Sequence, residues 1–303
     1  MELKHLEYFL AVAEEKNFTR AARRLHVVQS GVSATIKALE RELGVPLLNR
    51  NSRHVELTEA GAALLPKIRT ALDAVQDARD AVAEGEGELR GTLRIGTMTS
   101  VTMIDLPVLL GRYHRSHPEV TLRLTAAPSG SGGLARSLAE GALDLAFVSL
   151  PGGPPAGVVL QELGSAPLDL VVPAGHHLAR RSEVPFAALA GEPFVDFPVG
   201  YGNRTVTDSA FAAAGIDRQV VIEITDIATG PAFVREGLGI ALLPRFAIPR
   251  VSDLRQLTVT DADLNSPVAV AFSKGRRPNA AARALIAMTG VVIPLDHVSE
   301  RMD

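Results

Sequence analysis

The chain contains 303 residues, of which 47% are hydrophobic and 21% are charged, and its formal net charge is −3. This length predicts two or three domains, and the composition is typical of soluble α/β domains rather than of fibrous or disordered chains. The chain has no cysteine, which excludes disulfide bonds, thiol redox sensing and thiolate metal sites. No apolar run approaches the roughly 20 residues of a membrane span, and the N-terminus lacks a signal-peptide pattern, so we expect a cytoplasmic location.

Three short helices are predicted near the N-terminus. Apolar residues at three- and four-residue spacing favour a first helix over residues 3–15. Asn17 or Thr19 can cap a second, shorter helix. The third is expected to start at Gln29 or Ser30, to run to about Leu43 and to end at Gly44.

The third helix has two different faces. Its hydrophobic side chains share one narrow arc, on which they are expected to pack: Val32, Ile36, Leu39 and Leu43. The opposite arc is small and polar at first and cationic further along, with Ser30, Ala34, Lys37 and Arg41, while Ser33 lies to one side. Gln29 can form two hydrogen bonds with adenine, and Lys37 suits guanine or a phosphate. The helix therefore fits the major groove of DNA.

A hairpin and a local excess of positive charge support this interpretation. Leu47-Leu48 and Val55-Glu56-Leu57 predict two short strands around a polar tip, a wing from which Arg50 and Arg53 would reach the DNA backbone or the minor groove. Residues 16–53 hold eight basic residues and two acidic ones, which favours contact with a polyanion. The alternative is an ordinary helical subdomain with a surface hairpin.

The same segment resembles a known family. Its residues follow the order F-T-R-A-A-x-x-L-H-V-x-Q-S-x-V-S-x-x-I-x-x-L-E-x-E-L-G-V-x-L-L-x-R and then L-T-E-A-G, which is similar to the LysR-type transcriptional regulators. The resemblance implies a winged helix-turn-helix DNA-binding domain over residues 1–58. The expected DNA contacts are Thr19, Arg20, Gln29, Ser30, Ser33, Ala34, Lys37, Arg50 and Arg53. Three residues depart from the usual pattern, namely Val28 where Ser is common, Ser30 where Pro is common, and the small Ala34.

A long linker helix is predicted over residues 59–88, with Thr58 as its N-cap. A narrow apolar stripe follows the helix through Leu65, Ile68, Leu72, Val75 and Val82. Such a stripe cannot bury itself alone, so it favours dimerisation, although packing onto its own domain is the alternative. Pro66 is expected to remove one interior hydrogen bond and can kink the helix. The resemblance implies a homodimer or homotetramer that reads a two-fold symmetric promoter site on double-stranded DNA.

Strands and helices alternate from residue 89 to residue 303, which predicts an α/β effector-binding domain with mostly parallel sheets. The order strand, loop, helix, Glu-Gly, strand occurs twice, once ending in "LDLAFVSLP" and once in "LGIALLP". This weak repeat predicts two lobes, lobe one at about 89–163 and 267–303 and lobe two at about 164–266. The family comparison implies the same layout, similar to periplasmic binding proteins.

A small-molecule effector is expected in the cleft between the lobes, beyond the strand ends and at helix N-termini. The candidate residues are Thr97, Thr99, Ser100, Thr102, Ser129, Ser131, Ser149, Phe197, Tyr201, Asn203, Thr225, Asp226 and Thr229. Hydroxyl and N–H donors at helix starts favour a small anion such as a carboxylate. For each single serine or threonine, a plain helix cap is the alternative.

Signals for enzymatic chemistry are weak. The "SGSGG" stretch is not followed by Gly-Lys-Ser/Thr, and no GxSxG elbow or cofactor fingerprint is present. His176-His177 has no partner at metal spacing in the sequence, so an exposed turn is expected there, and Asp144 and Asp169 suit structural roles. The sequence thus predicts a ligand-responsive transcription factor with no cofactor and no metal. A constitutive architectural DNA-binding protein is the alternative, and a solute-binding protein or enzyme is a remote one.

Overall fold

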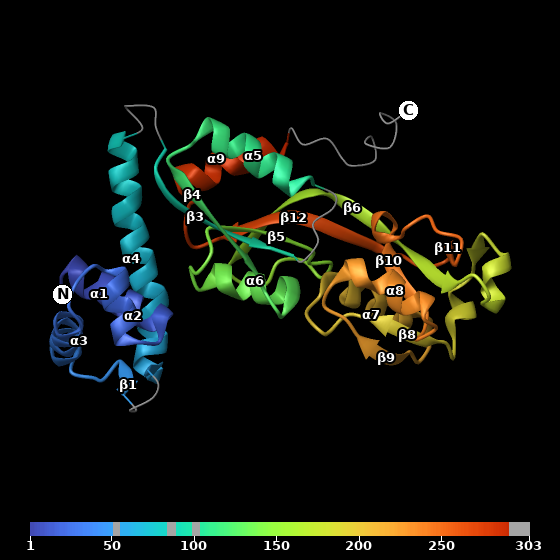
Figure 1. The fold of residues 1–303 in the computed structure, drawn as a ribbon, viewed down its shortest axis with the longest axis horizontal. Coiled ribbons are helices and arrows are strands. Elements are labelled where there is room, and N and C mark those ends of the chain that lie inside the picture. The colour runs from blue at the N-terminus through green and yellow to red at the C-terminus, as the bar shows by residue number, and fades with distance from the viewer. Residues whose placement is uncertain (51–54, 84–88, 99–103, 291–303) are drawn as a thin grey trace. The chain divides into compact units, whose positions relative to one another are not determined.

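The computed structural model describes residues 1–50, 55–83, 89–98 and 104–290. The chain divides into two units, one formed by Met1–Gly87 and Glu140–Ala142 and one formed by Glu88–Ala139 and Leu143–Asp303. Their elements are labelled in Figure 1. No helix in the described part of the chain is long and apolar enough to cross a membrane.

The first unit consists of helices and one hairpin. Its elements are α1 (Leu3–Glu15), α2 (Phe18–Arg24), α3 (Gln29–Leu43), β1 (Leu48–Arg50), β2 (Val55–Leu57) and α4 (Glu59–Ala83). The Asn17 side chain accepts hydrogen bonds from the first turn of α2, and Gly44 ends α3 in the left-handed region with φ of 73°. Thr58 Oγ1 accepts from Gly61 N at 3.0 Å at the start of α4. These observations confirm the predicted boundaries of α1 and α3, the caps at Asn17 and Thr58 and the start of α4, whereas the predicted end of the linker helix at residue 88 lies outside the described residues.

The core of this unit joins α1, α2, α3 and the start of α4. Val32, Ile36 and Leu39 of α3 are fully buried, as predicted. The prediction for Leu43 is wrong, because this side chain is 39% exposed. The chain leaves the helix at the next residue, and Leu47, which is 1% exposed, is the next leucine to enter the core.

The second unit is built on a mixed sheet with the strand order β4-β3-β5-β12-β6-β11-β7, to which β10 is added beside β6. These strands are β3 (Gly91–Thr97), β4 (Val120–Ala126), β5 (Leu145–Val148), β6 (Val158–Pro173), β7 (Glu183–Val184), β10 (Ala241–Pro244), β11 (Leu254–Val259) and β12 (Asn265–Ser273). A separate parallel pair contains β8 (Pro193–Asp196) and β9 (Gln219–Glu223). The prediction of mostly parallel sheets is wrong for the centre, where β6 and β12 pair with each other and with β5, β10 and β11 in antiparallel fashion.

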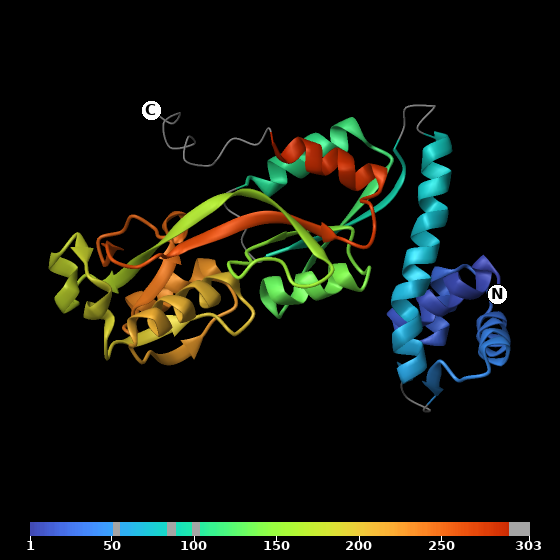
Figure 2. The same cartoon turned by 180° about the vertical axis from the view of Figure 1, so that it is seen from behind.

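Helices cover both faces of this sheet. They are α5 (Leu106–Ser116), α6 (Gly130–Ala139), α7 (Gly202–Ala214), α8 (Gly230–Arg235) and α9 (Ala280–Thr289), with short 3-10 turns η2 (His177–Arg180), η3 (Phe186–Leu189), η4 (Ile227–Thr229) and η5 (Arg245–Ala247). Helices α5 and α9 lie over one face of β3, β4 and β12, and α6 lies over the other (Figures 1 and 2). Helix α6 starts at Gly130 and holds three glycines in its first turn, although glycine is a poor helix former.

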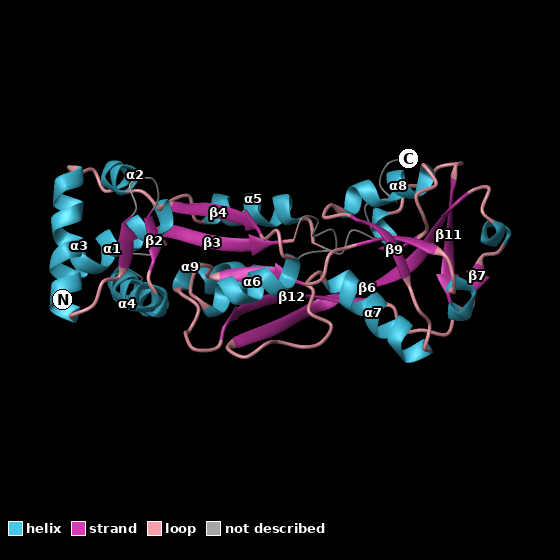
Figure 3. Ribbon diagram, turned by 90° about the horizontal axis from the view of Figure 1, so that it is seen from below, coloured by secondary structure: helices cyan, strands magenta, loops and turns pink. Residues whose placement is uncertain are grey.

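Two groups of hydrophobic cores divide the second unit into lobes. Lobe one contains β3, β4, β5, α5, α6 and α9, and lobe two contains β7–β11, α7, α8 and η2–η5. Strands β6 and β12 run through both lobes side by side (Figure 3). Their pairing has an irregularity at Leu163, where Glu162 faces Ala269 and Gly164 faces Val268. Gly164 has φ of 152°, so a β-bulge bends the strand pair as it passes from one lobe to the other.

Candidate functional site

One face of α3 is open to solvent. Gln29, Ser30, Ala34 and Lys37 are exposed, and Ser33 is half-buried. The buried arc of the same helix packs on α1 and α2. The residues predicted to contact DNA on α3 therefore lie together on the side that the core leaves free.

The N-terminus of α3 is not closed by a side chain. Val28 stands at the N-cap position, has no side-chain cap hydrogen bond and is 71% exposed. The first N–H groups of a helix have no intrahelical acceptor and carry the positive end of the helix dipole. This helix end can therefore bind a phosphate.

Thr19 and Arg20 lie in the first turn of helix α2, and both are exposed. The Arg20 guanidinium is paired with Glu15, with Nε 3.5 Å from Oε2 and a further hydrogen bond to the Glu15 carbonyl oxygen. The Arg20 side chain is 60% exposed, and exposed ion pairs of this kind contribute little to stability. A phosphate can therefore compete for Arg20 at small cost.

The predicted wing is present as a two-stranded hairpin. Leu48 pairs with Leu57 and Arg50 pairs with Val55. Glu40 of α3 holds the base of the hairpin, because its Oε1 accepts from Leu47 N at 2.9 Å and from Leu48 N at 3.2 Å. The Arg50 side chain and the whole of Arg53 lie outside the described residues.

Helix α4 uses part of its apolar stripe inside its own unit. Ile68 is 2% exposed and belongs to the core of the first unit, so the prediction that it lies on a dimer face is wrong. Leu65 and Leu72 are half-buried against the same core. Val75, two turns after Ile68 on the same face, is half-buried but is not part of that core. The Val82 side chain lies outside the described residues.

A small pocket lies between the two lobes of the second unit. Its cavity volume is about 50 Å³, and it is lined by Met98, Ala127, Gly130, Ser131, Ser149, Phe197, Tyr201, Gly202, Asn203, Thr225 and Ile227. Six of these residues were predicted, namely Ser131, Ser149, Phe197, Tyr201, Asn203 and Thr225. The sequence signal for the others is weak, because apolar side chains and glycines occur throughout the chain.

Several predicted effector residues do not line the pocket. Thr97 donates its hydroxyl to the Met98 carbonyl oxygen at 3.0 Å, and Ser129 is exposed. Asp226 caps η4 by accepting from Ala228 N at 3.1 Å. Thr229 donates its hydroxyl to the carbonyl oxygen of Asp226. For these side chains local capping and turn bonds explain the residue type, and Thr99, Ser100 and Thr102 lie outside the described residues.

The polar side chains of the pocket form one hydrogen-bonded chain. Ser131 Oγ accepts from Ser149 N at 2.9 Å. Ser149 Oγ and Ser266 Oγ are 2.8 Å apart, and Ser266 Oγ donates to Asn203 Oδ1 at 3.0 Å. Ser131, Ser149 and Ser266 are at most 4% exposed. This series of hydrogen bonds links α6 and β5 of lobe one to α7 of lobe two.

Glycines allow the lobes to approach closely beside this pocket. A Cβ atom at Gly130 would lie 2.9 Å from the Gly200 carbonyl oxygen, and one at Gly202 would lie 2.6 Å from the Ser149 carbonyl oxygen. Two hydrogen bonds join the lobes at the same place, from Gly132 N to Gly200 O at 3.1 Å and from Tyr201 OH to Pro128 O at 3.2 Å. The described structure is therefore a closed arrangement of the two lobes that side chains at these glycines would prevent.

A cluster of charged groups supports the lobe-two wall of the pocket. Arg204 donates to the Phe197 carbonyl oxygen at 2.8 Å and to Glu223 at 2.9 Å. Burial raises the pKa of the neighbouring Asp196 to about 6, and the facing Arg218 guanidinium, 2.8 Å away, offsets only part of this rise. These contacts hold Phe197, whose ring stacks on that of Tyr201.

A winged helix-turn-helix followed by a two-lobed α/β unit with a closed pocket defines a DNA-binding transcriptional regulator with an effector-binding domain. The chain belongs to the LysR family of these regulators. Residues 3–62 match the family described as bacterial regulatory helix-turn-helix protein, lysR family, and residues 86–290 match the LysR substrate binding domain. Proteins of this family are transcriptional regulators and not enzymes.

Several relatives match almost the whole chain. A probable hydrogen peroxide-inducible genes activator of Mycobacterium leprae is 34% identical over 298 residues, which are 96% of this chain and 94% of that protein. The transcriptional regulator BudR of Raoultella terrigena is 32% identical over 295 residues, which are 94% of this chain and 99% of that protein.

Solved structures show the same architecture. The LysR-family regulator CbnR in complex with its target DNA is 26% identical, with a TM-score of 0.62 over 96% of this chain and 98% of that chain. A full-length OxyR variant from Pseudomonas aeruginosa has a TM-score of 0.77 at 24% identity over 96% of this chain and 94% of that chain, a likeness of fold alone.

Proposed function

We propose that the pocket between the lobes binds a small carboxylate, which controls how this regulator acts on DNA. A set of hydrogen-bond donors carries the proposal. Ser131 Oγ already accepts from Ser149 N, and Asn203 Oδ1 already accepts from Ser266. The Ser131 hydroxyl hydrogen and the Asn203 amide hydrogens have no acceptor among the residues that the structure describes. A carboxylate would supply acceptors for both.

Two helix ends strengthen the preference for an anion. Gly130 and Gly202, the first residues of α6 and α7, both line the pocket, and α7 has no side-chain cap. The positive ends of two helix dipoles therefore meet at one place without a basic side chain in the pocket lining. A volume of about 50 Å³ holds a few water molecules, so the ligand is small or the lobes open to admit it.

The effector of this chain acts by binding and not by oxidising a thiol. Relatives in Mycobacterium leprae and Pectobacterium carotovorum are named as activators of hydrogen peroxide-inducible genes. The present chain has no cysteine, so it lacks the residue that reversible thiol oxidation requires.

On the DNA side, the exposed face of α3 reads bases, while the start of α2 and the wing hold the backbone. The proposed contacts are Thr19, Arg20, Gln29, Ser30, Ser33, Ala34, Lys37, Arg50 and Arg53. Helix α4 pairs two chains through Leu72, Val75 and Val82, so that two wings and two recognition helices read a two-fold symmetric site. The assembly is a homodimer or a homotetramer.

Effector and DNA are coupled because the ligand binds better when the lobes are closed. A ligand can shift an equilibrium only by its difference in affinity between the two states. The closed arrangement places donors from both lobes around one cavity, so an acceptor ligand gains most of its contacts only there. Closure then changes the geometry between subunits and with it the spacing of the DNA contacts.

Thermal unfolding of the full-length chain with a panel of small mono- and dicarboxylates tests the effector site. One compound or class should raise Tm, and the rise should grow with the logarithm of ligand concentration, because a ligand that binds only the folded state stabilises it by about 2.7 kcal/mol at 100 times Kd. Asn203→Asp should abolish this shift, because it replaces the amide donor with a repelling carboxylate. Ser209→Ala, an exposed change on the same helix outside the pocket, should leave it intact. A ligand shift that survives Asn203→Asp would place the effector elsewhere, and no shift with any carboxylate would favour a constitutive architectural protein.

Salt titration of DNA binding tests the recognition surface. Lys37→Ala should weaken binding to the chain's own upstream DNA and lower the slope of log K against log salt by about 0.9, because one phosphate contact is lost. Lys67→Ala on α4, which also removes an exposed cation but outside the proposed surface, is the matched control. Equal slopes for both variants and the parent would show that Lys37 does not contact a DNA phosphate.

A further inference from the structure

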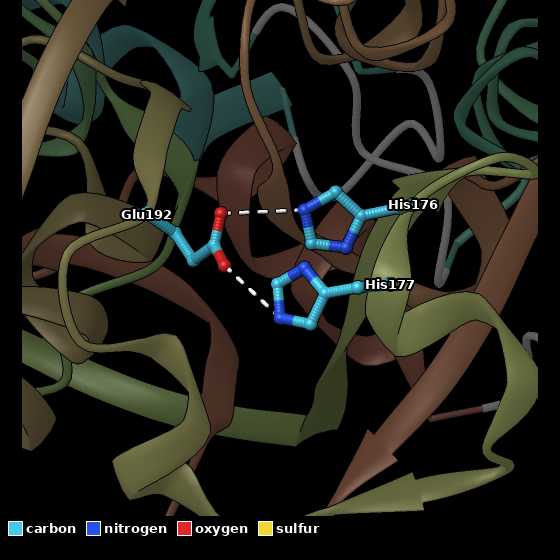
Figure 4. A group of neighbouring side chains, drawn as sticks. All are labelled: His176, His177 and Glu192. Carbon is cyan, nitrogen blue, oxygen red and sulfur yellow. Dashed lines mark hydrogen bonds and ion pairs between the residues drawn. The ribbon is translucent and has the colours of Figure 1, made fainter.

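Two adjacent histidines and a glutamate meet in lobe two, away from the effector pocket (Figure 4). His176 Nε2 lies 3.2 Å from Glu192 Oε2, and His177 Nε2 lies 3.4 Å from Glu192 Oε1. The expected exposed turn is confirmed for His177, whose side chain is 67% exposed, whereas the side chains of His176 and Glu192 are 17% and 16% exposed. The partner that was missing at metal spacing in the sequence is Glu192.

Anchored turns hold all three side chains in place. His176 N donates to the Pro173 carbonyl oxygen at 3.0 Å, where β6 ends, and His177 begins η2. Glu192 N donates to the Leu189 carbonyl oxygen at 3.3 Å, where η3 ends. Gly191, with φ of 78°, makes the turn that leads into Glu192. The histidine pair and the carboxylate are thus presented by two short segments fixed to the lobe-two core.

We propose that His176, His177 and Glu192 bind one divalent transition-metal ion of the Zn²⁺ class. Zinc bonds of about 2.0–2.1 Å in tetrahedral geometry put neighbouring ligand atoms roughly 3.3–3.4 Å apart. The two nitrogen–oxygen distances, 3.2 and 3.4 Å, are close to that separation, each histidine facing a different oxygen of the Glu192 carboxylate, and one ligand atom from each of the three residues lies within 4.8 Å of the others. Two imidazoles and a carboxylate are ligands that Zn²⁺ accepts, and imidazole also suits Ni²⁺ and Cu²⁺. The exposed side of His177 gives water access to the fourth position.

A hydrogen bond to the other ring nitrogen defines the competing state. Leu178 N donates to His176 Nδ1 at 3.3 Å. In the neutral ring this places the proton on Nε2, where it is shared with Glu192. Metal binding at Nε2 requires that proton to leave Nε2 and the Nδ1 nitrogen to carry one instead, which ends the bond from Leu178. Because that bond is long, its loss removes little of the binding energy.

The test uses the tag-free full-length chain and two probes, Co²⁺ for its absorption spectrum and Zn²⁺ in competition with a chromophoric chelator. One equivalent of Co²⁺ should bind with the intense visible bands of a four-coordinate ion, and Zn²⁺ should displace it. His177→Ala and Glu192→Gln should each lower the affinity for Zn²⁺ at least tenfold. His177 is exposed, so its substitution leaves the fold intact. His114→Ala, an exposed histidine on α5, should bind as the parent does.

Three results would overturn the proposal. Absence of stoichiometric Co²⁺ binding would do so, and so would wild-type affinity in both His177→Ala and Glu192→Gln, which would place the ion elsewhere. The third is a Tm that falls in Glu192→Gln while Zn²⁺ leaves the Tm of the parent unchanged. In that case the cluster is an ion pair and nothing more.

Discussion

Val28 gives the recognition helix an unusual start, because a valine side chain cannot accept a hydrogen bond from the first turn. Val28→Ser would place a hydroxyl acceptor at the N-cap. We expect the free energy of unfolding of the first unit to rise by about 1 kcal/mol. A denaturant titration that is monitored by hydrogen exchange of the α3 amides measures this rise. Val27→Ser, one residue earlier in the turn, is the matched control and should give no increase. Equal gains from both would mean that local polarity and not capping is responsible.

At the scale of single elements, we propose that α4 serves two purposes along one stripe, packing in its own unit and pairing two chains. Ile68 is buried in its own unit, whereas Val75 lies beyond that core on the same face. Ile68→Ala should therefore destabilise the first unit by about 2–5 kcal/mol. Val75→Glu should instead dissociate the oligomer with little change in unfolding free energy. Denaturant titration and sedimentation velocity on both variants separate the two effects. An intact oligomer in Val75→Glu would show that this face of α4 is not part of the subunit interface.

Among the elements, those that depend on neighbouring residues are predicted better from the sequence than those that depend on distant ones. The helices of the first unit begin and end at local signals such as Asn17 and Gly44, so their boundaries follow from neighbouring residues alone. Strands β6 and β12 depend on pairing between residues about a hundred positions apart, and the sequence indicated only where the chain passes between the lobes. Periodicity carries no information on such partners.

The candidate sites divide in the same way, into residues that local sequence signals predict and residues that only the tertiary fold brings together. Ser149 and Asn203 were found because ligands in α/β folds bind at strand ends and helix starts. Glu192 was missed because only the tertiary fold brings it to His176. Gly202 was missed because the sequence does not distinguish a glycine in a turn from a glycine at a close contact between two segments. At Thr97 and Asp226 the residue type reflects local hydrogen bonds, which a sequence cannot distinguish from a binding role.

At the scale of the whole second unit, closure of the lobes depends on glycines at their contact. A Cβ at Gly202 would lie 2.6 Å from the Ser149 carbonyl oxygen, and the backbone on both sides cannot yield without separating the lobes. A Cβ at Gly132, which faces the same loop, would meet Gly200 O at 3.6 Å, an ordinary contact. Both glycines lie in the first turn of a helix, where alanine is otherwise the better residue. The pair therefore separates the effect of closure from that of helix propensity.

We expect Gly202→Ala to hold the lobes apart and to lower the affinity for the carboxylate effector at least tenfold, while Gly132→Ala binds as the parent does. Calorimetric titration measures the affinity, and small-angle scattering with and without ligand measures the separation of the lobes. The Gly202→Ala chain should remain bound to DNA in its ligand-free mode, because the substitution leaves α3 and the wing untouched. Parent-like affinity in Gly202→Ala would show that the ligand does not need the closed state, and coupling through closure would then have to be abandoned.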